Sequence, residues 1–201
     1  INELNIEDDV VVLIDMPLNL PKTINDYPRN SDVAAKKILG RYHSSVFYAP
    51  VESWLNLNLK EINKICEESK KAKLSIQSYN LFSKIIEINS YKPKNKIILH
   101  EVHPELLIEY FIKNKYSKKT KIGQKQRLNI INKKFKCDIS LENIKQIKKR
   151  LTQRGEKIEL DDLIDVLFIA ALIKKENIFD FWVDDANIKN NELFRRLRIY
   201  Q

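Results

Sequence analysis

The string VVVLIDMP, residues 10–17, constrains the fold of this chain more than any other segment. An unbroken run of valine, leucine and isoleucine is typical of a strand that is covered on both faces, as in the interior of an α/β sheet. Pro17 cannot continue the hydrogen-bonded ladder, so the strand must end before it. Asp15 then lies where a buried strand opens into a loop, which is the usual place for a ligand site in α/β folds. The alternative is that Asp15 only caps a turn.

A second apolar run, residues 96–102, predicts another buried strand, and it also delivers an acid, Glu101, within the string ILHEVHPE. Pro104 limits this strand, and residues 106–112 continue as a helix. His100 and His103 flank Glu101, but a third and a fourth ligand for zinc are not evident. The ordinary interpretation of both histidines is packing and hydrogen bonding at the end of a strand.

Helical spacing of apolar residues accounts for most of the remaining chain. It predicts helices over residues 31–39, 59–73, 78–88, around Gln124, and over 143–154. Ser31 or Asp32 is a suitable N-cap for the first of these helices, and Gly40 a suitable residue just past its end. Residues 44–50, SSVFYAP, are expected to be extended. The two cysteines are far apart with no CxxC pairing, which indicates reduced thiols in a cytoplasmic protein.

The last predicted helix, DDLIDVLFIAALIKKE, begins at Asp161 or Asp162 and is apolar nearly all round, so we expect a buried helix with a charged tip. Asp162 and Asp165 are three residues apart and share a face, and Asp161 and Asp165, four apart, can do the same. The helix dipole alone explains an acid at position 161. Asp165 lies one turn inside the helix, where an ionised carboxylate is costly unless cations or donors meet it.

Positive charge is concentrated in one segment of the chain, whose net charge is +9. Residues 113–157 contain 16 Lys and Arg and three acids, a net charge of +13, so the rest of the chain carries −4. A basic segment on a mildly acidic body suits a phosphate-backbone partner, because binding releases counterions. A lysine-rich solvated surface is the alternative. The longest apolar run, residues 166–173, is too short to span a bilayer, so no membrane partner is expected.

Taken together, Asp15, Asp162 and Asp165 suggest a site for a divalent metal ion. Oxygen-only ligands suit Mg²⁺ or Mn²⁺, and two such ions can activate a water and stabilise the leaving oxygen of a phosphodiester.

Seven strings occur in an order that resembles the predicted RNase H-like nucleases grouped as domain of unknown function family 429. They are IDMPLNLP, RNSDVAAKKILG, SSVFYAP, SKIIEIN, EVHPE, SKKTKIGQKQR and DDLIDVLFIAA. The resemblance implies an α/β, RNase H-like fold, a mixed central sheet flanked by helices, distantly like the RuvC-type resolvases. It implies a domain over residues 1–176 with a helical insertion at about 25–92, and we expect residues 177–201 to be a tail that packs on it.

The resemblance also implies roles for individual residues. Asp15 matches the acid of the fourth strand in that fold, and Asp162 and Asp165 match the late-helix pair. Glu101 belongs to the family's own pattern, as an accessory ligand or an orienting base. The expected phosphate-binding residues are Lys84, Lys118, Lys119 and Arg127, with pairing to a site carboxylate as the alternative for Lys84.

The sequence departs from the family pattern at its start. Family members begin with strands that carry a Gly-x-Asp sequence, and nothing before Asp15 corresponds to it, so the first strands are expected to be missing from this chain. Two functions follow: a metal-dependent nuclease acting on DNA or RNA, or a catalytically incomplete nucleic-acid-binding or assembly module. A small-molecule phosphate hydrolase is a weaker third, because the chain has no glycine-rich phosphate loop. Resolvase relatives often act as dimers, so a homodimer is one option.

Overall fold

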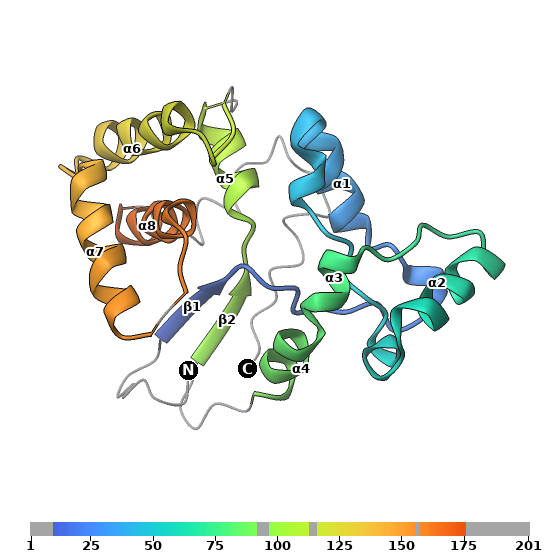
Figure 1. Ribbon diagram of the computed structural model, residues 1–201. Helices are drawn as coiled ribbons and strands as arrows, with labels where there is room; N and C mark the ends of the chain where they lie inside the picture. The colour runs from blue at the N-terminus through green and yellow to red at the C-terminus, as the bar shows by residue number, and fades with distance from the viewer. Residues whose placement is uncertain (1–9, 92–96, 113–115, 156, 176–201) are drawn as a thin grey trace. The chain divides into compact units, whose positions relative to one another are not determined.

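Both apolar segments that end in an acid form strands in the computed structural model, which describes residues 10–91, 97–112, 116–155 and 157–175. Strands β1 (Val10–Ile14) and β2 (Ile97–Glu101) pair in parallel, with Val10 opposite Ile97 and Ile14 opposite Glu101 (Figure 1). The described part of the chain is otherwise mostly helical, with this two-stranded sheet. The α/β prediction is therefore confirmed in this coarse form, and the larger mixed sheet stays a prediction.

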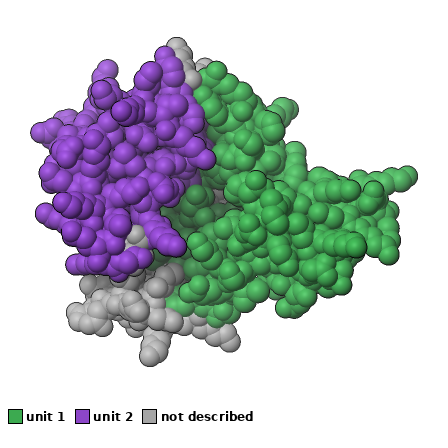
Figure 2. Space-filling model, viewed as in Figure 1, with its two compact units in different colours: residues 1–103, 188–201 green, residues 104–187 purple. Residues whose placement is uncertain are grey.

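The described residues fall into two units, which Figure 2 colours green and purple. Those up to His103 form unit 1 and those from Pro104 form unit 2. Besides the strands, unit 1 contains helices α1 (Asn30–Leu39), α2 (Leu59–Glu68), α3 (Ile76–Asn80) and α4 (Phe82–Ser90). Unit 2 contains α5 (Pro104–Ile112), α6 (Lys121–Phe135), α7 (Leu141–Gln153) and α8 (Leu160–Lys175).

The main apolar core of unit 1 is built by the helices and loops between the strands. It contains Tyr27, Val51, Trp54, Ile62, Cys66, Leu74, Phe82 and Ile85. Tyr27 packs edge-on against Trp54, with ring centroids 4.7 Å apart. A second cluster around Leu18 and Leu99 lies against the sheet and includes Val12 and Ile14. Burial of these apolar side chains is the main favourable term in forming the unit.

Local signals placed most helix boundaries of unit 1 within a few residues, and the differences have local causes. α1 begins at Asn30, so the predicted N-caps Ser31 and Asp32 are wrong: Asp32 lies inside the helix, where its carboxylate pairs with Arg29. Gly40 follows α1 with φ of +51°, a backbone conformation that favours glycine. Helix α2 stops at Glu68, short of the predicted end.

Two further predictions for unit 1 need correction. The helix expected over residues 78–88 is two helices, α3 and α4, with Leu81 between them. The segment 44–50 is only partly extended, because a 3₁₀ helix covers Gly40–Ser45. Residues Val46 to Pro50 have no regular structure, and Asp32 accepts a hydrogen bond from the Ala49 backbone N–H there at 2.9 Å.

In unit 2, α8 packs against α5, α6 and α7 (Figure 1). The neighbours cover the side of α8 that carries Ile164, Phe168 and Ile169, all buried. Val166, on the other side, is 61% exposed. The expected buried helix is therefore buried along the face that carries Ile164, Phe168 and Ile169, whereas Val166 and Ala170 are exposed. No helix among the described residues is long and apolar enough to cross a membrane.

The predicted C-terminal tail, residues 177–201, lies outside the described residues.

Candidate functional site

The first turn of α8 gathers three carboxylates around one lysine of the preceding basic segment. Lys118 Nζ donates a hydrogen bond to Asp165 Oδ2 at 2.7 Å. The same ammonium lies 3.8 Å from Asp161 Oδ2 and 4.0 Å from Asp162 Oδ1. Asp165 is buried, whereas Asp162 is exposed. The sequence-predicted pair Asp162 and Asp165 thus meets Lys118, which was predicted to bind phosphate.

The second oxygen of Asp165 is held by a fully buried arginine. Arg127, on α6, donates from Nη1 to Asp165 Oδ1 at 2.9 Å, and its Nη2 reaches both oxygens of Glu105 at 2.8 and 3.0 Å. The Arg127 side chain is 1% exposed and that of Glu105 8%. The guanidinium therefore links the start of α5 to α8 across α6, and it faces these carboxylates rather than solvent.

Burial and charge act in opposite directions on this network. Burial raises the pKa of Asp165 above its ordinary value, although Lys118 and Arg127 act to lower it. Burial by itself would lower the pKa of Lys118, but the hydrogen bond and charge of Asp165 outweigh it and raise that pKa. Lys118 therefore stays an ammonium ion, which meets the requirement that a carboxylate inside an apolar helix be compensated.

A tight turn before α6 sets the position of Lys118. Thr120 caps α6, because its Oγ1 accepts from the Gly123 N–H at 3.1 Å, and it donates back to the Ser117 carbonyl at 2.8 Å. A Cβ on residue 123 would lie 2.1 Å from that carbonyl oxygen. Glycine is thus required here by the close approach of backbone, and the string SKKTKIG contains the cap and the glycine that form this turn.

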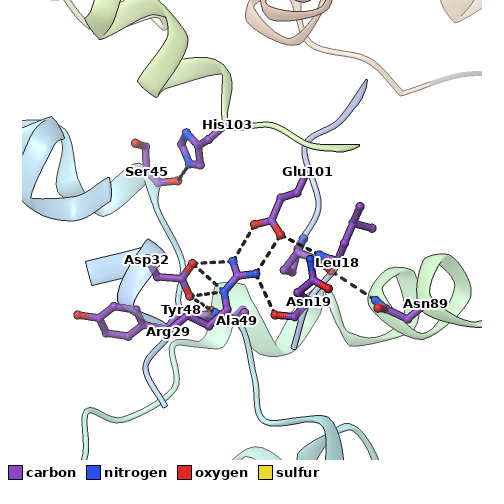
Figure 3. A network of polar contacts seen from close by, with 12 residues as sticks. Leu18, Asn19, Arg29, Asp32, Ser45, Tyr48, Ala49, Asn89, Glu101 and His103 are labelled. Atoms are coloured by element: carbon purple, nitrogen blue, oxygen red, sulfur yellow. Dashed lines mark hydrogen bonds and ion pairs between the residues drawn. The ribbon is translucent and has the colours of Figure 1, made fainter. Parts of the chain in front are cut away.

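Glu101 belongs to a separate polar network in unit 1, shown in Figure 3. Arg29 donates from Nη1 to Glu101 Oε2 at 2.9 Å and from Nη2 to Oε1 at 2.7 Å. Glu101 Oε2 also accepts from the Leu18 N–H at 2.9 Å. The bidentate pairing ties the end of β2 to the start of α1, and the Leu18 N–H ties it to the loop after β1, so Glu101 has a structural position.

Arg29 completes its contacts with Asp32 on α1 and with the loop after β1. Its Nη2 and Nε donate to Asp32 Oδ1 at 2.6 and 3.0 Å, and Nη1 donates to the Asn19 carbonyl at 3.2 Å (Figure 3). Both side chains are buried, at 6% and 5% exposure. Burial would lower the pKa of Arg29, but Asp32 and Glu101 outweigh it and raise that pKa. The sequence pattern RNSD, with opposite charges three residues apart, is the signal that could have identified this pair.

The remaining predicted residues of unit 1 are exposed. Asp15 follows β1 at the carboxyl end of the parallel sheet, where the sequence placed it. Lys84 lies on α4. In unit 2, Lys119 is also exposed, next to the turn that positions Lys118. That Asp15 and Asp165 share an ion stays a prediction, since each residue is described within its own unit.

Sequence reasoning missed Arg29, Asp32 and Glu105 as members of these networks. Glu105 stands in the quoted string EVHPE, four residues after Glu101, but nothing in the local pattern indicates that its partner is Arg127.

The carboxylate oxygens around Lys118 are the kind of ligand atom that a hard cation prefers. Three carboxylates offer oxygen ligands only, as Mg²⁺ and Mn²⁺ prefer, and they already surround one positive charge. Among the residues that the structure describes, no group of three or more His, Cys, Asp or Glu is arranged as a metal site. The ammonium of Lys118 supplies the compensating charge in this arrangement.

Comparisons with known proteins give one match. No curated protein and no solved structure matches the chain. A family model described as protein of unknown function (DUF429) matches residues 1–176. Because this match covers most of the 201 residues, the chain belongs to the DUF429 family.

Proposed function

We propose that this protein is a nuclease that hydrolyses phosphodiester bonds of DNA or RNA with the help of Mg²⁺ or Mn²⁺. The observation that carries the proposal is the set of three carboxylates, Asp161, Asp162 and Asp165, gathered around a single positive charge. The RNase H-like resemblance of the family strings supports it, as does the basic segment 113–157 that contains Lys118.

In this proposal each group has a defined task. Asp162 and Asp165 hold the metal ion, and the exposed Lys119 holds phosphate oxygens of the substrate. Arg127 and Glu105 hold the Asp165 carboxylate in one orientation, so that this ligand is preorganised for the metal ion. The metal supplies activation of a water and charge stabilisation at the leaving oxygen when it is bound.

A catalytically incomplete nucleic-acid-binding module is the second candidate. It is favoured by one specific observation: both oxygens of Asp165 are already paired, one with Lys118 and the other with Arg127. A carboxylate compensated by two cations is a stable structural element without any metal. The third candidate, a small-molecule phosphate hydrolase, has no comparable observation in its favour.

One experiment separates the two candidates. The full chain is incubated with labelled single-stranded and duplex DNA and RNA, with Mn²⁺, Mg²⁺ or EDTA, beside the variants Asp165→Asn and Asp138→Asn. Asp138 is an exposed acid of unit 2 outside the carboxylate cluster and serves as the matched control.

We expect metal-dependent cleavage that Asp165→Asn abolishes and Asp138→Asn retains. Equal cleavage by the wild type and Asp165→Asn would show that the site is wrong. Binding without cleavage in any metal would establish the module instead.

A further inference from the structure

The structure divides the cations of the basic segment into two groups. Lys118 and Arg127 are engaged with the carboxylates of α8 and α5. On α7, Lys145 pairs with Glu142 and Lys148 with Glu159. The cations on the outer face of α6 differ: within the described residues, no carboxylate forms an ion pair with Lys121, Lys125 or Lys133.

These three lysines and Asn129 form a regular row of exposed residues, spaced four apart, that we call the α6 stripe: Lys121, Lys125, Asn129 and Lys133. The opposite side of the helix carries buried Leu128 and Ile131 and faces the core. At a rise of about 1.5 Å per residue, the stripe extends about 18 Å along the helix. Lys136, also exposed, caps its C-terminal end.

Helix stability does not explain the charges of the stripe. α6 contains five Lys and Arg and no acid. Lys121 lies in the first turn, at the positive end of the helix dipole, where cations are unfavourable. Lys121 and Lys125, four residues apart, repel each other. The row is therefore maintained at a small cost to the helix.

A general excess of lysine in the chain does not explain the stripe either. Helix α2 in unit 1 is also rich in lysine, with Lys60 and Lys64, but it contains three glutamates, and Lys64 pairs with Glu68 at 3.9 Å. Its surface is thus balanced where that of α6 is not. On α6, the unpaired lysines lie in one row along the helix.

We infer that the α6 stripe binds the phosphate backbone of a nucleic acid. Three lysines in a row offer flexible point charges, which suit repeated phosphates and carry no information on base sequence. An anionic membrane surface is a poorer fit, because a helix that binds in the bilayer interface buries an apolar face and this face offers only Ile122. The inference rests on the proposed function only for the identity of the partner.

The test measures binding and not cleavage. Full-length protein in EDTA is titrated against labelled duplex DNA, single-stranded DNA and RNA at several salt concentrations. The stripe variant K121Q/K125Q/K133Q is compared with K37Q/K60Q/K64Q, which removes three exposed lysines from α1 and α2 and changes the net charge equally. Both variants are first shown to unfold at the wild-type temperature, as exposed substitutions should.

For duplex DNA, the slope of log affinity against log salt should fall by about 0.9 for each lost phosphate contact. We expect a slope smaller by about 2 to 3 in the stripe variant and an unchanged slope in the control. An equal decrease of this slope in both variants would mean that only the net charge of the protein matters, and it would overturn the inference. So would a stripe variant whose slope is the same as that of the wild type.

The outcome is independent of catalysis. Asp165→Asn should bind with the slope of the wild type, because the stripe does not include Asp165. If the stripe variant loses binding while no protein cleaves in Mn²⁺, the proposed nuclease fails and the binding surface stands. If cleavage is metal-dependent and the stripe variant binds normally, the surface is wrong and the nuclease stands.

Discussion

Lys118 and Asp165, 47 residues apart, are joined by a 2.7 Å hydrogen bond between an ammonium and a buried carboxylate. The contact connects the basic segment to the first turn of α8, so charge compensation and helix packing in unit 2 depend on each other. Arg127 holds the other carboxylate oxygen. This arrangement leads to predictions about stability that are independent of any activity.

Removal of Arg127 should cost more stability than removal of the Asp165 charge. Arg127→Met removes the buried cation that contacts both Asp165 and Glu105, which costs about 3–5 kcal/mol. Asp165→Asn keeps a side-chain acceptor, and Lys118, with 26% of its side chain exposed, can turn to water. Calorimetry measures the loss of stability in each of the two variants, and hydrogen exchange measures it locally in the peptides of α8. A larger loss in Asp165→Asn would contradict the assignment of Arg127 as the central cation.

The Arg29 network should be the strongest polar element of unit 1. Arg29→Gln is expected to lower the free energy of unfolding by about 3–5 kcal/mol, because Asp32 is then left buried without its cation. Lys22→Gln breaks the ion pair with Glu52 at the surface and should cost less than about 1 kcal/mol. Urea unfolding followed by tryptophan fluorescence compares the two variants, since Trp54 lies in the core of this unit. Similar unfolding midpoints would refute the structural role of Arg29.

Gly123→Ala should destabilise unit 2, although alanine is the better helix former by about 1 kcal/mol. The added Cβ would collide with the Ser117 carbonyl and displace the turn that holds Lys118. Asn129→Ala, on the exposed side of the same helix, is the control and should be neutral or slightly stabilising. Thermal unfolding by circular dichroism distinguishes them. A stabilised Gly123→Ala protein would show that the turn relaxes without cost.

Alkaline pH should weaken unit 1 through two buried groups of its core. Burial raises the pKa of Cys66 above its ordinary 9.0 and that of Tyr27 above its ordinary 10.0. Since the folded-state pKa of each exceeds the unfolded value, the stability they contribute is complete below pH 9.0 and is lost as the pH rises further. Urea midpoints from pH 7 to 11 measure the loss.

Tyr27→Phe provides the control for this pH dependence. No hydrogen bond to the Tyr27 hydroxyl is present among the described residues, so the variant should be about as stable as the wild type at pH 7. Its stability should fall less steeply above pH 10, because one of the two titrating groups has been removed. An unchanged pH profile in this variant would exclude Tyr27 as a source of the effect.

Short-range patterns predicted most of the secondary structure of the described part. The apolar runs that end at Asp15 and Glu101 form adjacent parallel strands, and the first turn of α8 carries its acids where the sequence placed them. Runs of β-branched residues, prolines and helix periodicity act over a few residues and are therefore readable from the chain itself. The corrections, such as the break at Leu81, are local too.

The partners that charged residues find far along the chain were decided by tertiary structure alone. Arg29 meets Glu101 across 72 residues, and Arg127 is buried while Lys125, two positions earlier, is exposed. In the sequence these cations look alike, because charge is a property of the residue whereas burial is a property of the helix face that packing selects. The sequence by itself thus determined which segments carry the charges, and only the packing of helices that are distant in the chain determined which charges neutralise one another and which remain on the surface.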